Sequence, residues 1–105
     1  METKYAAQRI IKDVQNNDER IQITGYVKEI LPENTITLDD KTGVIKISLS
    51  DTDFSYKKGD LINVIGDLNI SMDGEKVLQA QIIQDMKKLN FSYYLKLYEL
   101  KKELV

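Results

Sequence analysis

The chain of 105 residues contains no cysteine, no histidine and no tryptophan, and it has one proline and five glycines. Without cysteine and histidine it lacks thiol nucleophiles, imidazole general bases, disulfides and the usual zinc ligands. It also lacks a Walker-type phosphate-binding loop and a recognisable pair of nucleophile and base. The adjacent carboxylates Asp39 and Asp40 would point to opposite faces of a strand and predict no metal site. We therefore expect a protein that is not an enzyme and needs no metal or cofactor.

Long apolar runs and an excess of positive charge are missing as well. The apolar runs span only a few residues, far fewer than a membrane-spanning helix needs, and no secretory leader is recognisable at the N-terminus. We expect an intracellular protein of one domain, residues 1–105, in the cytoplasm or nucleoid. The net charge of -2 and the pI of about 5.1 argue mildly against tight autonomous binding of nucleic acid, because modules that act alone usually carry a basic excess.

Alternation of apolar and polar residues is the strongest pattern that is present. It is typical of half-buried strands, and it occurs in five segments: 20–31, 35–38, 44–49, 61–70 and 76–84. Turn-forming residues separate neighbouring segments at 32–34, 39–43 and 72–75. In the last segment the inward set comprises Leu78, Ala80 and Ile82.

The stretch 51–60 interrupts the alternation between the third and fourth strands. Asp51 or Asp53 is expected to cap a short helical turn that reaches Tyr56, after which the chain crosses to a new strand. Five short strands with one-sided patterning and one crossing connection predict an all-β fold, a closed five-stranded Greek-key barrel over about 20–85.

Both ends of the chain show helical spacing. The N-terminal segment, 1–19, can form a short helix capped by Thr3, with extended backbone as the alternative; its apolar residues are Ala6, Ala7, Ile10, Ile11 and Val14. Near the C-terminus, Asn90 or Ser92 can cap a helix over about 91–104, which contains no glycine or proline.

The C-terminal helix carries two apolar stripes at about 100° per residue. One stripe consists of Phe91, Tyr94, Leu95 and Tyr98, and the other of Tyr93, Leu97, Leu100 and Leu104. A helix that only covers its own barrel needs one stripe, so the second predicts a partner helix. The alternative is that the second stripe stays exposed. The expected partner interface comprises Phe91, Tyr93, Tyr94, Leu97, Tyr98, Leu100 and Leu104.

Three short motifs carry a family likeness: Ile11-Lys12-Asp13-Val14, the strand Ile21–Val27, and Lys58-Gly59-Asp60-Leu61 ahead of Val64-Ile65-Gly66. Through them, over roughly residues 10–85, the chain resembles the OB-fold domains that bind single-stranded nucleic acid. Within this class it is similar to the small and middle subunits of replication protein A and their telomere-capping relatives. In those proteins the helix after the fifth strand assembles with helices of partner subunits, and a compact chain rich in lysine and glutamate fits an archaeal source.

The resemblance implies a binding face on the outside of the second and third strands, between the loops that flank them. Mapped onto this sequence, the nucleic-acid-binding residues are Tyr26, Lys28, Thr35, Thr37, Lys46 and Ser48, with Lys41 from a turn and Lys76 from the start of the last strand. Tyr26 would stack on a base, or instead pack beside a helix.

The resemblance thus implies a subunit of a replication protein A-like complex. It would bind single-stranded DNA in replication, repair and recombination, together with other OB-fold subunits or a second copy through the C-terminal helix. Two alternatives remain open. One is a structural assembly subunit with little nucleic-acid binding of its own, and the other is a module for RNA or tRNA.

Overall fold

The computed structural model describes residues 6–49 and 54–104. Thr3, Asp51 and Asp53, which the sequence suggested as caps, lie outside the described residues. In chain order the elements are β1 (Ala7–Gln8), the 3₁₀ helix η1 (Ile11–Asp13), β2 (Arg20–Leu31), β3 (Thr35–Asp39), β4 (Val44–Ser48), β5 (Leu61–Ile70), β6 (Lys76–Asp85) and α1 (Phe91–Glu103). Among these residues, no helix is long and apolar enough to cross a membrane.

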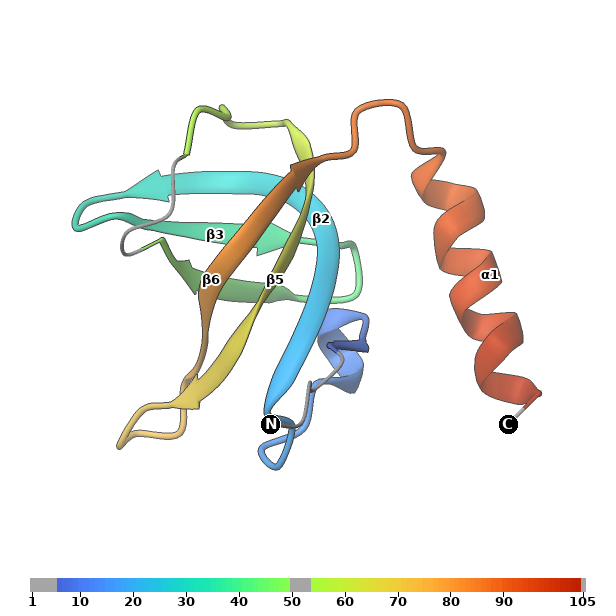
Figure 1. Cartoon of the computed structure of the whole chain (residues 1–105), viewed down its shortest axis with the longest axis horizontal. Helices are drawn as coiled ribbons and strands as arrows, with labels where there is room; N and C mark the ends of the chain where they lie inside the picture. The colour runs from blue at the N-terminus through green and yellow to red at the C-terminus, as the bar shows by residue number, and fades with distance from the viewer. Residues whose placement is uncertain (1–5, 50–53, 105) are drawn as a thin grey trace, which may run out of the picture.

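Five strands close into a barrel, with α1 standing beside it (Figure 1). β2, β3 and β4 form an antiparallel meander. The chain then crosses to β5, which pairs antiparallel with β2, and β6 closes the barrel by pairing antiparallel with β5 and parallel with β4. The predicted five-stranded Greek-key barrel with a C-terminal helix is confirmed.

β2 is long enough to serve two neighbours. Its first half pairs with β5 and its second half with β3, and Tyr26 pairs with both Asp39 and Leu61 where the neighbours change. At this corner a Cβ on Gly25 would lie 2.9 Å from the Asp39 carbonyl oxygen, so only glycine lets β3 approach. A bulge between Val27 and Glu29 then bends the strand onward.

The core contains the inward residues of the alternating segments. Its strand members are Ile21, Ile23, Val27, Ile36, Leu38, Ile45, Ile47, Ile62, Val64, Leu78 and Ala80. The prediction for Ile82 is wrong, because this side chain is 50% exposed. A register shift pairs Ile65 with Ile82 and Gly66 with Ala80. The extra residue in β6 reverses the alternation, and Ile83 packs against the core instead.

The N-terminal segment is extended, and the short helix expected there is wrong. β1 pairs in parallel with β2, and only a single 3₁₀ turn follows. Ile10 and Val14, on either side of the turn, are buried with extended backbone. Their β-branched side chains favour that backbone, and the extended path lets both reach the interior from one end of the barrel. The alternative of extended backbone is the better description.

The Asp40 carboxylate fixes this segment in place. Its side chain is fully buried in the turn between β3 and β4. One oxygen accepts hydrogen bonds from the Thr42 amide (2.9 Å) and hydroxyl (2.6 Å), and the other accepts from the Ile11 amide (2.7 Å). A buried carboxylate needs such donors, because desolvating it without them is costly. Asp40 therefore ties the 3₁₀ turn to the β3–β4 turn.

α1 begins where Asn90 caps it, as predicted, since the Asn90 side chain accepts from the Tyr93 amide at 3.1 Å. The helix docks beside β2 and the N-terminal segment (Figure 1). Phe91 and Tyr26 meet edge to face with ring centroids 5.2 Å apart. Farther along, Asp13 accepts from the Tyr98 hydroxyl and from Lys102 Nζ, each at 2.9 Å. The hydrogen bond from Lys102 lowers the pKa of Asp13, and the hydrogen bond from Tyr98 lowers it further.

Replacing Asp40 by asparagine should destabilise the fold by about 2–3 kcal/mol, because the amide nitrogen would face either the Ile11 N–H or the Thr42 N–H, donor against donor. Urea denaturation measures this change. The matched control is Asp39→Asn, since the Asp39 carboxylate is only half-buried and accepts from the Lys41 amide at 2.8 Å. Equal losses in the two variants would contradict the role assigned to Asp40.

Candidate nucleic-acid interface

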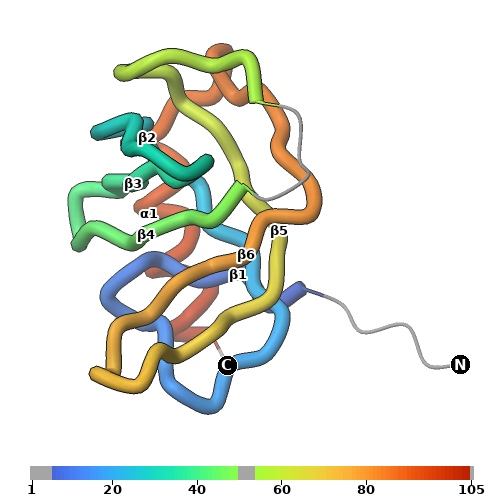
Figure 2. Tube along the Cα trace, turned by 90° about the vertical axis from the view of Figure 1, so that its left-hand side faces the viewer, coloured from blue at the N-terminus to red at the C-terminus, as the bar shows by residue number. Residues whose placement is uncertain are grey.

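The outer face of β3 and β4 brings four predicted binding residues together. Thr35 lies opposite Ser48, and Thr37 lies opposite Lys46, in an antiparallel register. Directly opposed side chains in such a ladder are neighbours on one face of the sheet. β3 and β4 lie on the side of the barrel away from α1, which is behind them in Figure 2. The four residues therefore form one continuous polar surface that the helix does not cover.

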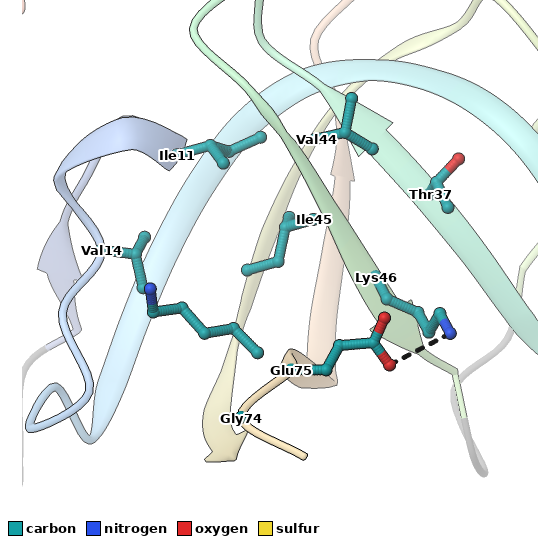
Figure 3. Close-up of a pocket in the computed structure, with 9 residues that line it drawn as sticks. Ile11, Val14, Thr37, Val44, Ile45, Lys46, Gly74 and Glu75 are labelled. Atoms are coloured by element: carbon teal, nitrogen blue, oxygen red, sulfur yellow. Dashed lines mark hydrogen bonds and ion pairs between the residues drawn. The ribbon is translucent and has the colours of Figure 1, made fainter. Parts of the chain in front are cut away.

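A pocket opens at one end of this surface (Figure 3). It has a volume of about 330 Å³ and is lined by Ile11, Val14, Thr37, Val44, Ile45, Lys46, Gly74, Glu75 and Lys76. The lining residues come from the N-terminal segment, β3, β4 and the β5–β6 hairpin. Lys46 Nζ lies 3.2 Å from Glu75 Oε1 and joins the sheet to the hairpin. The pocket therefore contains both apolar side chains and charges of both signs.

The Thr37 hydroxyl oxygen is buried and has no hydrogen-bond partner within residues 6–49 and 54–104. An unsatisfied buried hydroxyl costs about 1–3 kcal/mol, so such groups are rare in folded proteins. They are tolerated where a ligand or a solvent molecule completes the bonding. The unsatisfied hydroxyl of Thr37 therefore makes the fold less stable at this face than it would be with an apolar side chain there.

Of the remaining predicted binding residues, Lys76 lines the pocket, whereas Tyr26, Lys28 and Lys41 lie apart from it. Lys28 is exposed at the β2 bulge, beside Glu29, which pairs with Thr37. Lys41 lies over the Tyr26 ring, with Nζ 5.7 Å from the ring centroid, and Phe91 contacts the same ring. Tyr26 therefore packs beside the helix, which is the second of the two arrangements that the sequence allowed.

The predicted partner interface divides into two sets. Phe91 and Tyr98 are buried against the barrel, and the half-buried Tyr94 accepts a hydrogen bond from Gln8 at 2.9 Å. The other stripe faces solvent with side chains 38–86% exposed, and we call it the outer stripe: Tyr93, Leu97, Leu100 and Leu104. One helix therefore both docks on the barrel and presents apolar surface outward.

Neither the protein-family models nor the curated proteins contain a match to the chain. Solved structures do. A chain of the S. pombe Stn1–Ten1 complex aligns over 97% of this chain and 96% of its own, with a TM-score of 0.79 and 15% identity. The S. pombe telomere capping protein Ten1 aligns over 94% and 99% (TM-score 0.73, 16% identity).

The second OB-fold domain of replication protein A from Methanococcus maripaludis aligns over 79% of this chain and 98% of its own. Its TM-score is 0.61 and its identity 23%. The fold is the OB fold. At identities of 15–23% the likeness is one of fold, and the site must be read from this chain's own residues.

Sequence reasoning missed several residues of this OB-fold pocket. Val44 occupies an outward position in a face that is otherwise polar, and that departure from the pattern was a usable signal. Ile11 and Val14 were interpreted as members of a helix, which hid their place in the wall. Glu75 was treated only as part of a turn. No cluster of three or more potential metal ligands occurs in the described part of the chain.

Replacing Thr37 by valine should stabilise the OB fold by about 1 kcal/mol, because it removes the unsatisfied hydroxyl and keeps the branched shape. The same change should weaken nucleic-acid binding if the hydroxyl bonds to the ligand. Urea denaturation and a binding titration measure the two effects. Thr35→Val is the control, since the Thr35 hydroxyl already donates to the Glu33 carbonyl. A loss of stability in Thr37→Val would contradict this account.

Proposed function

We propose that this protein is a single-stranded DNA-binding OB-fold subunit of a replication protein A-like complex. The observation that carries the proposal is the uncovered surface of Thr35, Thr37, Lys46 and Ser48, with Lys76 at its pocket. Lysines and hydroxyl groups are the side chains that contact a phosphate backbone. A single-stranded ligand laid along this surface would meet them in succession.

The same surface supports weak binding by the isolated chain. Few lysines line it, Glu75 neutralises Lys46 in part, and the whole chain has a net charge of -2. Electrostatic contacts dominate the affinity of such sites, and each lost phosphate contact lowers it. We therefore expect useful affinity when partner subunits extend the binding surface.

The names of the structurally similar OB-fold proteins support this proposal. One is a domain of replication protein A, and the other two are a telomere capping protein and a complex that contains it. We propose by analogy that this chain acts in DNA replication, repair or recombination. The same face could instead bind RNA or tRNA. Comparing the affinities for DNA and RNA strands of the same sequence would detect this.

A second candidate function is that of a structural assembly subunit. The outer stripe favours it, because four apolar side chains on one exposed helix face form an unusual surface for a chain that acts alone. The barrel would then serve as a scaffold for the helix. The two functions are compatible in space, since the helix and the face of β3 and β4 lie on different sides of the barrel (Figure 2).

A titration of labelled oligo-dT at low salt tests the first function. We expect the triple variant Lys28→Ala, Lys46→Ala and Lys76→Ala to bind at least tenfold more weakly, with a salt slope smaller by about 2. The control replaces Lys87, Lys88 and Lys101 by alanine, which removes the same charge from exposed positions away from this surface. Equal losses would show that net charge alone decides binding, and no binding by wild type, alone or with a partner, would overturn the function.

Sedimentation velocity tests the second function. We expect Leu97→Glu to abolish concentration-dependent association without lowering the melting temperature, because Leu97 is in the outer stripe and does not contribute to the core. Ser92→Glu adds the same charge at an exposed position outside the stripe and should change neither. A Leu97→Glu variant that sediments like wild type but melts earlier would mean that the stripe packs on its own barrel.

A further inference from the structure

Aromatic side chains are absent from the outer face of β3 and β4. Among the described residues, the Tyr26 ring is enclosed by Phe91 and Lys41. Phe54 and Tyr56 contact each other and pack against the core. The other described aromatic residues belong to α1. Single-stranded nucleic acids usually gain affinity by stacking bases on such rings. Here a base must find apolar contact elsewhere.

The pocket provides that apolar contact. Ile11 and Val14 form one wall, and Val44 and Ile45 lie on β4 (Figure 3). Val44 is 46% exposed and offers its side chain to an incoming group. The volume of about 330 Å³ is at the lower end of the roughly 300–1,000 Å³ of small-molecule sites. It therefore suits one flat heterocycle rather than a stacked run of bases.

Glu75 gives the pocket a chemical preference. An ionised carboxylate only accepts hydrogen bonds, so it favours groups that donate them. Adenine, cytosine and guanine each carry an exocyclic amino group, whereas the exocyclic polar groups of thymine and uracil are carbonyl oxygens and their one donor, the ring N3–H, lies between them. A glutamate side chain accepts from the cytosine amino group in known recognition geometries. Glu75 should therefore favour an amino-bearing base and disfavour thymine.

The hairpin holds Glu75 at a defined position. The Ser71 amide donates to the Glu75 carbonyl at 2.9 Å, and the Glu75 amide donates to the Ser71 hydroxyl oxygen at 3.0 Å. Gly74 completes the turn with φ of 88°, a left-handed conformation that favours glycine. Lys46 then pairs with the carboxylate at 3.2 Å. Because these contacts constrain both the backbone and the carboxylate of Glu75, binding a ligand costs little further conformational entropy at this residue.

We propose that this pocket receives one unstacked nucleobase that carries an exocyclic amino group. The base lies between the apolar walls and donates to Glu75, while Lys46 and Lys76 face the adjoining phosphates. The inference rests on the proposed function and adds to it a preference for base at one position of the strand.

The test uses oligo-dT and oligonucleotides of the same length that carry a single central dC, dA or dG. Fluorescence anisotropy should show about tenfold tighter binding when the central base carries an amino group, the usual size of such discrimination. Glu75→Met should abolish this preference and should strengthen binding of oligo-dT itself, because it removes a negative charge and frees Lys46. Glu103→Met removes the same charge on α1 and should leave the preference intact.

A second pair of variants tests the apolar wall. Val44→Gln should lower the affinity for the amino-bearing strands, whereas Ile82→Gln, at a strand position of similar exposure outside the pocket, should not. Salt-sensitive binding that ignores the central base would overturn the inference and leave the proposed function standing. A base preference that survives both Glu75→Met and Val44→Gln would also overturn it. If no oligonucleotide binds to the chain, alone or with a partner, the proposed function fails and the inference fails with it.

Discussion

The Asp40 carboxylate accepts hydrogen bonds from two parts of the chain that are far apart in sequence, the Ile11 amide and the turn at Thr42. This contact holds the N-terminal segment across one end of the barrel, where Ile10 and Val14 become buried. The same segment supplies Ile11 and Val14 to the wall of the pocket and Asp13 to the contact with α1.

The OB barrel keeps its two candidate surfaces apart. β3 and β4 lie on one side of the barrel, and α1 lies behind them in Figure 2. The barrel between them is rigid because its inward residues form one continuous apolar core. The two candidate surfaces therefore do not compete for the same part of the barrel.

Much of this fold could be predicted from the alternation of apolar and polar residues, since a strand with one buried face must repeat every two residues. The same rule failed at Ile82, because the bulge opposite Gly66 depends on how two strands meet and leaves no local pattern. The helical spacing of Ile10 and Val14 misled for a related reason. Apolar residues at those intervals also serve an extended segment that fills a barrel end, and only the tertiary contact distinguishes the two.

The candidate site was predictable in part. Thr35, Thr37, Lys46 and Ser48 follow from strand register, once the barrel is known. The enclosure of Tyr26 by Phe91 required the position of the helix, which propensity does not provide. The residues that line the pocket come from segments far apart in the sequence. They meet only in the folded chain, so the sequence alone could not predict the pocket.

The 3₁₀ turn Ile11–Asp13 contacts the pocket at its first residue and α1 at its last. Ile11 forms part of the pocket wall, and Asp13, two residues later, accepts hydrogen bonds from Tyr98 and Lys102 of α1. This single turn of backbone therefore lies between the helix and the pocket, and the Ile11 amide ties it to Asp40. The position of α1 and the shape of this pocket wall therefore depend on the same three residues.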